Sequence, residues 1–338
     1  MIRNHCYSDN LHNKKILIIG PYPPPNGGVE IHIKRVKSKL EKQKNTVVIF
    51  DTSKKESSKI KVIRDLLRIF FTHKPQLVHL HEPTMSRLKL AITVLLRFVL
   101  EFKITSIDHN CRVLYNYSEF NKKIFRILTK KIDHVVVIGD TTNKCYIDNK
   151  VTTKKNYSIE SPYLPPNIKE EHNIYKKYPQ SLHNFIKTRT PLLTANAFAL
   201  TLINNKDLYG FDMCIDLIKD LKAMHPNIGL IFGIAKNKEK KYLEKLKTII
   251  KDLSLEKNIF IFISNEEFWP LIKRSDIFLR PTLSDGHSVS VKEACELHIP
   301  TIASNVCIRP EKTILFQAAN KNDFYQKANT WIQSNANK

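Results

Sequence analysis

The chain has 338 residues, enough for two domains of ordinary size, and a hydrophobic content of 42% excludes a chain that is disordered throughout. The net charge is +23, which favours an anionic partner such as phospholipid, nucleic acid or a phosphorylated substrate. The six cysteines are dispersed without a Cys-x-x-Cys pair, so the sequence predicts neither a zinc site nor a disulfide framework.

Short apolar runs alternate with longer amphipathic stretches through the first half of the chain. The runs are typical of buried strands, which we predict at residues 15–20, 46–51, 76–81, 102–108 and 134–139. The stretches predict helices at residues 29–43, 59–72, 86–101 and 120–130. Strands that are buried on both faces read as continuous apolar runs, so we expect a parallel sheet with helices on both sides.

The alternation stops at residues 161–190, where four prolines stand among polar residues, as is typical of a linker. It then resumes with predicted strands at residues 192–195, 227–233, 258–263, 276–280 and 300–304. Predicted helices cover residues 207–225, 238–253, 266–274, 288–297 and 322–334. The sequence therefore predicts an α/β protein with two doubly wound domains, at residues 1–165 and 166–325, and a C-terminal helix or tail at residues 326–338.

Paired glycines, Gly27 and Gly28, follow the first predicted strand and precede the first predicted helix. Glycine lets a backbone approach a ligand closely, and a helix N-terminus presents free N–H groups to an anion. The segment matches neither the G-x-G-x-x-G nor the P-loop pattern, so it supports neither a dinucleotide-binding fold nor a P-loop. A plain turn and an anion site both fit these two residues.

A second motif, SDGHSVSVKEA at residues 284–294, opens a helix shortly after a predicted strand. Its carboxylates Asp285 and Glu293 lie about two helical turns apart, so they can contact separate parts of one elongated ligand. Backbone amides that would face the anionic middle of such a ligand belong to Gly286, His287, Ser288 and Val289. The alternative is an N-capped helix, with Ser288 or Asp285 as the cap and Glu293 on a wet face.

Histidines end two predicted strands of the first domain. His79 and His81 end one strand, and the trio Asp-His-Asn at residues 108–110 ends another. A lone histidine is usually a packing residue with satisfied hydrogen bonds, and we expect His32 to be structural or to support the site without contacting the ligand. A polar trio at the end of a buried strand is harder to attribute to packing, because ligands of such sheets bind at the carboxyl ends of strands. We therefore place His109 at the predicted site.

No Asp-x-Asp sequence occurs in the chain, which argues against a carboxylate-bound divalent ion that bridges a diphosphate. We therefore expect neither a metal ion nor a cofactor. Helix N-termini and basic side chains would balance the charge of phosphate groups. The candidate cations are Arg280, at the end of a predicted strand, Lys206 and, less strongly, Arg309.

Three segments together resemble glycosyltransferase family 4, whose members have the GT-B fold. GGVEIHIKRV resembles the glycine-rich loop and following helix of that family, and VHLHEP resembles its strand that ends in histidines. SDIFLRPTLSDGHSVSVKEACELHIPTIAS resembles its donor-binding segment and is the most specific of the three. The likeness runs from about residue 14 to about residue 324 and implies two Rossmann-like domains that face each other across a cleft.

The resemblance implies retaining transfer of a sugar from a nucleotide-diphosphate sugar, a UDP- or GDP-sugar, without a metal ion. Gly27 and Gly28 would then lie near the donor diphosphate. His109 would contact the donor sugar or the reacting centre. Asp285 would hold hydroxyl groups of the donor sugar, and Glu293 would bind those of the ribose.

The chain departs from the family pattern at two places. Asp285 stands where the family usually has Glu, and the shorter side chain is expected to alter sugar choice. The usual Gly-Arg and Lys-Gly phosphate-binding pair is not matched, since Tyr209 stands where the lysine is common; Arg280 or Lys206 would substitute. The segments LRPTLSDG and RPEKTILF resemble enzymes of bacterial surface-polysaccharide gene clusters. This implies assembly of O-antigen or capsule on a lipid-linked or other saccharide acceptor.

A basic amphipathic stretch, KIKVIRDLLRIFFTHK at residues 59–74, favours contact with an anionic membrane surface. Its apolar residues are expected in the core, whereas its basic residues would attract lipid. Residues 1–165 hold 30 basic and 14 acidic side chains, so the positive charge is concentrated in the first half. We find no signal-peptide pattern and no uncharged stretch of about 18 apolar residues. The expected location is cytoplasmic, peripheral on the inner face of the cytoplasmic membrane.

Other classes of protein remain open. The charge permits a nucleic-acid-binding protein, although no recognition motif occurs and we expect no nucleic-acid partner. A catalytically degenerate GT-B subunit is compatible with the unmatched Lys-Gly pair. A GT-B enzyme of another reaction, such as a sugar-nucleotide epimerase, is disfavoured by the polysaccharide-type donor segment.

Overall fold

A computed structural model describes residues 11–24, 27–53, 58–151, 157–161, 163–236, 239–285 and 288–335. The chain divides into two compact units, each described by itself below. The first comprises Met1–Pro24 and Gly28–Leu164, and the second comprises Pro25–Gly27 and Pro165–Lys338. In the described residues, no helix is long and apolar enough to cross a membrane.

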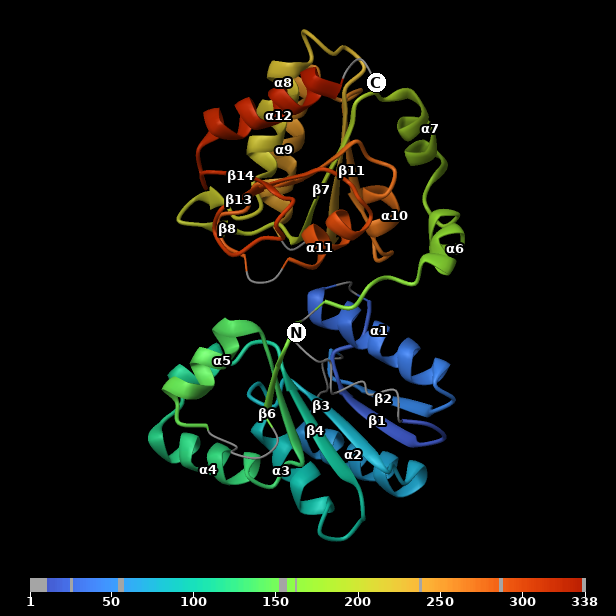
Figure 1. Ribbon diagram of the computed structural model, residues 1–338, viewed down its shortest axis with the longest axis vertical. Helices are drawn as coiled ribbons and strands as arrows, with labels where there is room; N and C mark the ends of the chain where they lie inside the picture. Colours follow the sequence, from blue (N-terminus) through green and yellow to red (C-terminus); the bar gives the residue numbers. More distant parts are fainter. Residues whose placement is uncertain are drawn as a thin grey trace. The chain divides into compact units, whose positions relative to one another are not determined.

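The first unit contains a six-stranded parallel sheet in the order β2-β1-β3-β4-β5-β6 (Figure 1). Its strands are β1 (Lys15–Gly20), β2 (Thr46–Asp51), β3 (Leu77–His81), β4 (Lys103–Asp108), β5 (His134–Ile138) and β6 (Tyr157–Glu160). Its helices are α1 (Gly28–Lys42), α2 (Lys59–His73), α3 (Arg87–Leu96), α4 (Glu119–Thr129), α5 (Gly139–Asp148) and the short 3-10 helix η2 (Arg112–Asn116).

Alternate residues of the strands in this sheet bury two separate cores, one on each face. In β1, Ile16 and Ile18 join the core formed with α1, whereas Leu17 and Ile19 join the core formed with α2, α3 and α4. Successive side chains of a strand point to opposite faces, so a strand that is apolar throughout needs cover on both sides. Each such side chain contributes about 1.5–3 kcal/mol when it is fully buried.

The second unit contains another six-stranded parallel sheet, in the order β11-β10-β7-β12-β13-β14. Its strands are β7 (Leu192–Ala199), β10 (Gly229–Lys236), β11 (Ile259–Ile263), β12 (Ile277–Arg280), β13 (Thr301–Ser304) and β14 (Ile314–Phe316). Its helices are η3 (Ile168–Glu170), α6 (Glu171–Tyr175), α7 (Gln180–Thr188), α8 (Phe211–Leu221), α9 (Lys240–Asp252), α10 (Trp269–Ile272), α11 (Val289–Glu296) and α12 (Lys321–Asn335). A small antiparallel hairpin joins β8 (Leu202–Ile203) to β9 (Lys206–Asp207).

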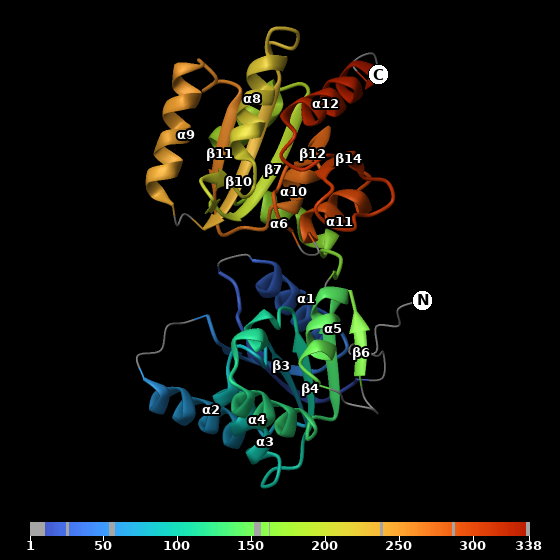
Figure 2. The same ribbon diagram turned by 90° about the vertical axis from the view of Figure 1, so that its left-hand side faces the viewer.

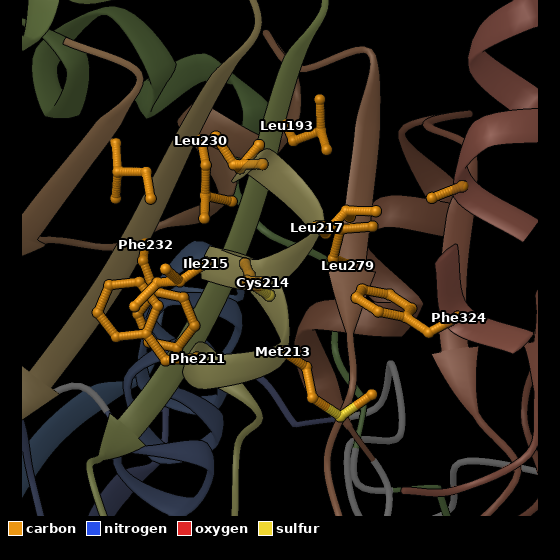
Figure 3. Packing of buried hydrophobic residues seen from close by; sticks show 14 of the residues in the cluster. Leu193, Phe211, Met213, Cys214, Ile215, Leu217, Leu230, Phe232, Leu279 and Phe324 are labelled. Carbon is orange, nitrogen blue, oxygen red and sulfur yellow. The ribbon is translucent and has the colours of Figure 1, made fainter. Parts of the chain in front are cut away.

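The larger core of the second unit lies between its sheet and the helices α8, α9 and α12 (Figures 2 and 3). Phe211 of α8 stacks on Phe232 of β10 with ring centroids 3.9 Å apart. Leu193 and Leu279 extend this core across the sheet, and Phe324 brings α12 onto it. The helix predicted to end the chain is therefore part of the packed second unit.

Strand order fixes where each unit is able to bind a ligand. In the second unit the order of strands reverses between β7 and β12, and in the first unit it reverses between β1 and β3. Doubly wound sheets bind ligands beyond the carboxyl ends of strands at such a switch point. The strands at these two positions end at Ala199 and Arg280 in one unit and at Gly20 and His81 in the other.

The structure differs from the predicted elements where local patterns are weak. The predicted linker at residues 161–190 contains the helices α6 and α7. The helix predicted to start at Asp207 begins at Phe211, because Asp207 belongs to the hairpin. The prediction of no disulfide is wrong, since Cys111 and Cys145 form one. These cysteines are 34 residues apart, and the polar helix α5 that carries Cys145 was not predicted.

Candidate active site

Histidines gather at the switch point of the first unit. His81 is the last residue of β3, His109 directly follows the neighbouring strand β4, and His32 lies on α1. His81 Nδ1 and His109 Nε2 are 3.2 Å apart, and the rings of His32 and His109 have centroids 4.7 Å apart. The structure therefore brings together His81 and His109, which the sequence pattern singled out, and adds His32, which we had expected to be structural or to support the site indirectly.

Burial governs the protonation of these histidines. It lowers the pKa of His81 and of His109 well below the usual value for histidine, and the neighbouring imidazoles add to the effect. Burial, with His32 close by, lowers the pKa of His79 to about 4. These rings are therefore neutral at physiological pH, and a neutral imidazole has one donor and one acceptor nitrogen for hydrogen bonds.

Asp108 orients the loop that carries His109. Its Oδ2 accepts a hydrogen bond from Tyr146 Oη at 2.9 Å, and its Oδ1 accepts from Thr84 Oγ1 at 3.2 Å and from the amide of Asn110 at 3.2 Å. Burial, only partly opposed by these hydrogen bonds, raises the pKa of Asp108 to about 6. A carboxylate with three donors of its own supports the loop rather than a ligand.

Sequence reasoning missed one acidic residue of this site. Glu82 follows His81 directly, and burial together with Asp108 and Glu30 raises its pKa to about 7. The backbone of Glu82 is left-handed, with φ of 51°. The sequence did contain a signal for Glu82, because residues 79–82 read His-Leu-His-Glu and Glu82 directly follows the two strand-end histidines.

Of the glycines near the first strand, Gly20 is the one that the structure places against a histidine. Gly28 is exposed and begins α1, and Gly27 is buried. Gly20 ends β1, where a Cβ atom would lie 2.9 Å from His81 Cβ and 2.6 Å from Ile33 Cδ1. A side chain at Gly20 would therefore displace the strand end that positions His81.

In the second unit, an ion-pair network stands at the end of β12. Arg280 donates from Nε to Asp285 Oδ2 at 3.0 Å and from Nη2 to Asp285 Oδ1 at 3.3 Å. Arg309 donates from Nη1 to the same Oδ2 at 2.9 Å. Burial alone would raise the pKa of Asp285, but the two guanidinium groups more than offset it and hold the pKa below the ordinary value. We call these three residues the Arg–Asp–Arg network.

Asn196 connects this network by hydrogen bonds to β7, the other strand at the switch point, and to α11. Arg280 Nη1 donates to the backbone oxygen of Asn196 in β7 at 2.9 Å, and Asn196 Nδ2 donates to Ser290 Oγ in α11 at 2.8 Å. The guanidinium carbon of Arg280 also lies 5.1 Å from the ring centroid of Tyr209. Arg280 therefore contacts the tyrosine that stands where the resemblance predicts a lysine.

The remaining residues of the predicted donor segment are placed as follows. Ser288 caps α11, since its Oγ accepts from the amide of Val291 at 3.3 Å, and Val289 is the first helical residue. Glu293 is 5% exposed, so the alternative that put it on a wet face is wrong, while the cap at Ser288 is confirmed. Gly286 and His287 lie outside the described residues.

Lys206 lies in the hairpin and is exposed. Its neighbour Asp207 is buried and accepts hydrogen bonds from the amides of Tyr209, Gly210 and Phe211 at 2.9, 3.2 and 3.1 Å. Gly210 has φ of 68°, and a Cβ atom there would lie 2.3 Å from the backbone oxygen of Pro281. The start of α8 is thus held against the strand end that carries Arg280.

Residues 195–332, less than half of the chain, match the family described as Glycosyl transferases group 1. We call this matched segment the group 1 domain, and it lies within the second unit. This domain begins in β7 and ends in α12, so it contains the whole Arg–Asp–Arg network and Glu293. No curated protein matches the sequence.

Solved structures resemble nearly the whole chain. A glycosyltransferase from Rickettsia africae ESF-5 has a TM-score of 0.66 and 14% identity, over 95% of this chain and 89% of that chain. Anabaena HepE in complex with UDP has a TM-score of 0.62 and 14% identity, over 95% and 90%. Sucrose-phosphate synthase from Thermosynechococcus elongatus has a TM-score of 0.62 and 13% identity, over 96% and 90%.

These likenesses show the fold. The predicted GT-B fold with two doubly wound, Rossmann-like units is confirmed. Together with the group 1 glycosyl transferase domain, the fold supports a glycosyltransferase enzyme.

Proposed function

We propose that the chain transfers a sugar, with retention of configuration, from a UDP- or GDP-sugar to a lipid-linked or other saccharide acceptor in O-antigen or capsule assembly. The observation that carries the proposal is the Arg–Asp–Arg network at the switch point of the group 1 domain, with the buried carboxylate of Glu293 on the following helix. HepE binds UDP and, in another crystal structure, UDP-glucose. A nucleotide-sugar of this kind is the donor that we infer here.

The network supplies positive charge for a diphosphate. Two guanidinium groups and one carboxylate leave a net charge of +1 in a site where the side chain of Arg309 is 2% exposed. Arg309 Nη2 is buried and has no hydrogen-bond partner among the described residues, so one donor remains for an anion. Charge-assisted bonds from arginine to phosphate are among the strong hydrogen bonds of proteins. We infer that Arg280 and Arg309 stabilise the leaving diphosphate, without a metal ion at that place.

The network also limits what Asp285 can hold. A carboxylate has about four acceptor positions, and the two arginines occupy three of those on Asp285. One position on Oδ1 remains, so we infer that Asp285 accepts a single hydroxyl of the donor sugar. We assign Glu293 to the ribose hydroxyls and the amides of residues 286–289 to the phosphates.

His109 is assigned to the donor sugar or the reacting centre. Because its imidazole is neutral, it can accept or donate a hydrogen bond but does not supply positive charge. We infer that the acceptor hydroxyl attacks on the face of the leaving group and that a phosphate oxygen of the leaving group takes its proton. Positioning and electrostatic stabilisation then supply the catalysis, and no protein nucleophile is invoked. Gly27 and Gly28 keep their assignment near the diphosphate.

Peripheral attachment to the cytoplasmic face of the membrane is part of the proposal. On α2 a stripe of exposed residues contains the basic side chains Lys61, Arg64 and Arg68, with exposed Ile60 and Phe71 at its ends. Apolar side chains that insert into the headgroup region and cations that attract anionic lipid are the two contributions to interfacial binding. A lipid-linked acceptor would make such binding useful.

A catalytically degenerate subunit is the alternative that Tyr209 keeps open. A thermal-shift panel of UDP- and GDP-sugars separates the two, because a ligand at 100 times its dissociation constant stabilises by about 2.7 kcal/mol. Transfer is then measured with the donor that binds. We expect Glu293→Gln to lower kcat/KM on the order of 100-fold by removing a charged hydrogen bond to the donor.

Glu296→Gln is the matched control, since Glu296 is exposed on the same helix and is expected to leave transfer unchanged. Equal rates in the two variants would remove Glu293 from the site. A panel in which no nucleotide-sugar shifts the unfolding temperature would favour the degenerate subunit. Strict dependence of transfer on Mg²⁺ or Mn²⁺ would contradict the proposed metal-free diphosphate site.

A further inference from the structure

Three histidines from three separate elements converge in the first unit: His32 of α1, His81 at the end of β3 and His109 after β4. Each offers one ring nitrogen, and these three nitrogens lie within 4.8 Å of one another. We propose that these residues, the triple-histidine cluster, bind one divalent transition-metal ion, for which Zn²⁺ is the representative. This inference goes beyond the proposed sugar transfer and does not depend on it.

The spacing of the nitrogens fits tetrahedral coordination. Zn–N bonds of about 2.0–2.1 Å at the tetrahedral angle place two ligand nitrogens about 3.3–3.4 Å apart. His81 Nδ1 and His109 Nε2 are already 3.2 Å apart. No separation exceeds 4.8 Å, so the nitrogens have to approach by at most roughly 1.5 Å to reach the tetrahedral spacing, which rotation of an imidazole about its side-chain bonds can supply.

The cluster is largely shielded from water, since His32 and His81 are buried and His109 is partly buried. A divalent ion bound there would be the largest local charge in the site.

The donor set selects the class of ion. Imidazole nitrogens suit Zn²⁺, Cu²⁺ and Ni²⁺, whereas Mg²⁺ and Mn²⁺ prefer carboxylate and water oxygens. The proposed ion therefore differs from the diphosphate-bridging ion that the missing Asp-x-Asp sequence argues against. Three protein nitrogens leave a fourth tetrahedral position for a water molecule or a ligand oxygen. An ion on His109 would compete with the donor sugar for that side chain.

The test is metal binding by untagged full-length protein that has been stripped with a chelator and dialysed. Zn²⁺ is titrated by calorimetry, and Co²⁺ is titrated in its place so that visible absorption reports tetrahedral coordination. We expect one ion per chain for the wild type and for His134→Gln, a control that removes a histidine of the same unit outside the cluster. His32→Gln, His81→Gln and His109→Gln should each weaken binding on the order of 100-fold.

Thermal unfolding with and without Zn²⁺ gives a second readout and shows whether each variant is folded. We expect a Zn²⁺-dependent rise in unfolding temperature for the wild type and His134→Gln that is lost in His109→Gln, whose side chain is only partly buried. Absence of Zn²⁺ binding to the wild type would overturn the proposal. So would equal affinity in the wild type and the folded cluster variants, since that result would mean binding elsewhere.

Discussion

In the second unit, the carboxylate of Asp285 is paired with two guanidinium groups in a largely buried site. Asp285 Oδ2 accepts from both Arg280 Nε and Arg309 Nη1, so the carboxylate is balanced by positive charge from two different parts of the chain. Buried ion pairs cost desolvation, and breaking one by removing a partner leaves an uncompensated charge. The three residues therefore stabilise one another as a set.

Replacement of Asp285 should show this coupling. Asp285→Asn keeps the shape but leaves Arg280 and Arg309 without their counter-charge, and we expect a loss of about 3 kcal/mol in the stability of the second unit. Both tryptophans of the chain, Trp269 and Trp331, lie in that unit, so tryptophan fluorescence during urea unfolding reports on it selectively. An Asn variant as stable as the wild type at pH 7 would show that the ion pairs add nothing.

The same comparison has a pH dependence of known sign. The folded-state pKa of Asp285 is held below its ordinary value, so its contribution is complete at pH values above the unfolded-state pKa of about 3.9. The contribution is lost as the pH falls through the lower, folded-state pKa. We therefore expect the stability difference between wild type and Asp285→Asn to be constant from about pH 6 to 8 and to shrink below about pH 4. A difference that grows on acidification would refute this account.

Arg280 and Lys206 were equal candidates for the missing phosphate-binding lysine, and the structure distinguishes their surroundings. Arg280 is buried at the switch point, whereas Lys206 is exposed in the hairpin. Loss of a charged hydrogen bond costs about 1.5–3 kcal/mol, which is on the order of 10–100-fold in affinity. We expect this loss of UDP or GDP affinity in Arg280→Met and less than about threefold in Lys206→Met, measured by calorimetry. A larger loss in Lys206→Met would reverse the assignment.

At the scale of elements, the pattern of apolar residues predicted the strands that form continuous apolar runs. The bounds of β1 and β2 are those expected from sequence, because both are uninterrupted apolar runs, although only β1 is buried along most of its length and β2 lies at an edge of the sheet. The short strands β6 (YSIE) and β14 (ILF) were missed, since three or four residues give no period. Helix α5 (GDTTNKCYID) was missed because its sequence is mostly polar. Tertiary contacts stabilise these elements, and a local pattern does not contain them.

The start of α8, directly after the β8–β9 hairpin, depends on hydrogen bonds to one side chain, that of Asp207. Asp207 accepts three backbone amides at the helix start and a hydrogen bond from Tyr242 Oη at 3.1 Å. We expect Asp207→Ala to destabilise the second unit by about 2 kcal/mol, at the upper end for a lost helix cap, in urea unfolding followed by tryptophan fluorescence. Tyr242→Phe removes one of the four bonds and should cost about 1 kcal/mol. Equal losses in the two variants would argue against the capping role.

For the candidate site, the sequence predicted which segments end at strand ends but not how they meet. The predicted donor segment and the strand-end histidines were singled out because each stands where a doubly wound sheet binds ligands. The contribution of Arg309 was underestimated, because it reaches Asp285 from 24 residues further along the chain. Glu82 and Asn196 were missed, since burial and cross-strand contacts give them their roles.

At the scale of the whole molecule, the charge of +23 can be tested against lipid. Replacing Lys61, Arg64 and Arg68 of α2 by Gln should weaken binding to vesicles that contain anionic lipid, because each basic residue near such a surface contributes roughly 1 kcal/mol. Co-sedimentation at low and high salt measures it, and binding should fall as salt rises. The matched control replaces Lys240, Lys241 and Lys245 of α9, which are exposed on the second unit. Equal loss in both variants would mean that net charge, and not α2, determines binding.

The contact between Arg280 and Tyr209 has a consequence for how relatives of this chain are judged. The resemblance to glycosyltransferase family 4 predicts a lysine where Tyr209 stands, and a classification by sequence alone would count the chain as inactive. In three dimensions a guanidinium supplied by another strand stands over the tyrosine ring, 5.1 Å from its centre. Relatives of this chain are therefore better judged by whether a cation reaches this place in the fold, as Arg280 does here from seventy-one positions later, than by the residue at the position of Tyr209.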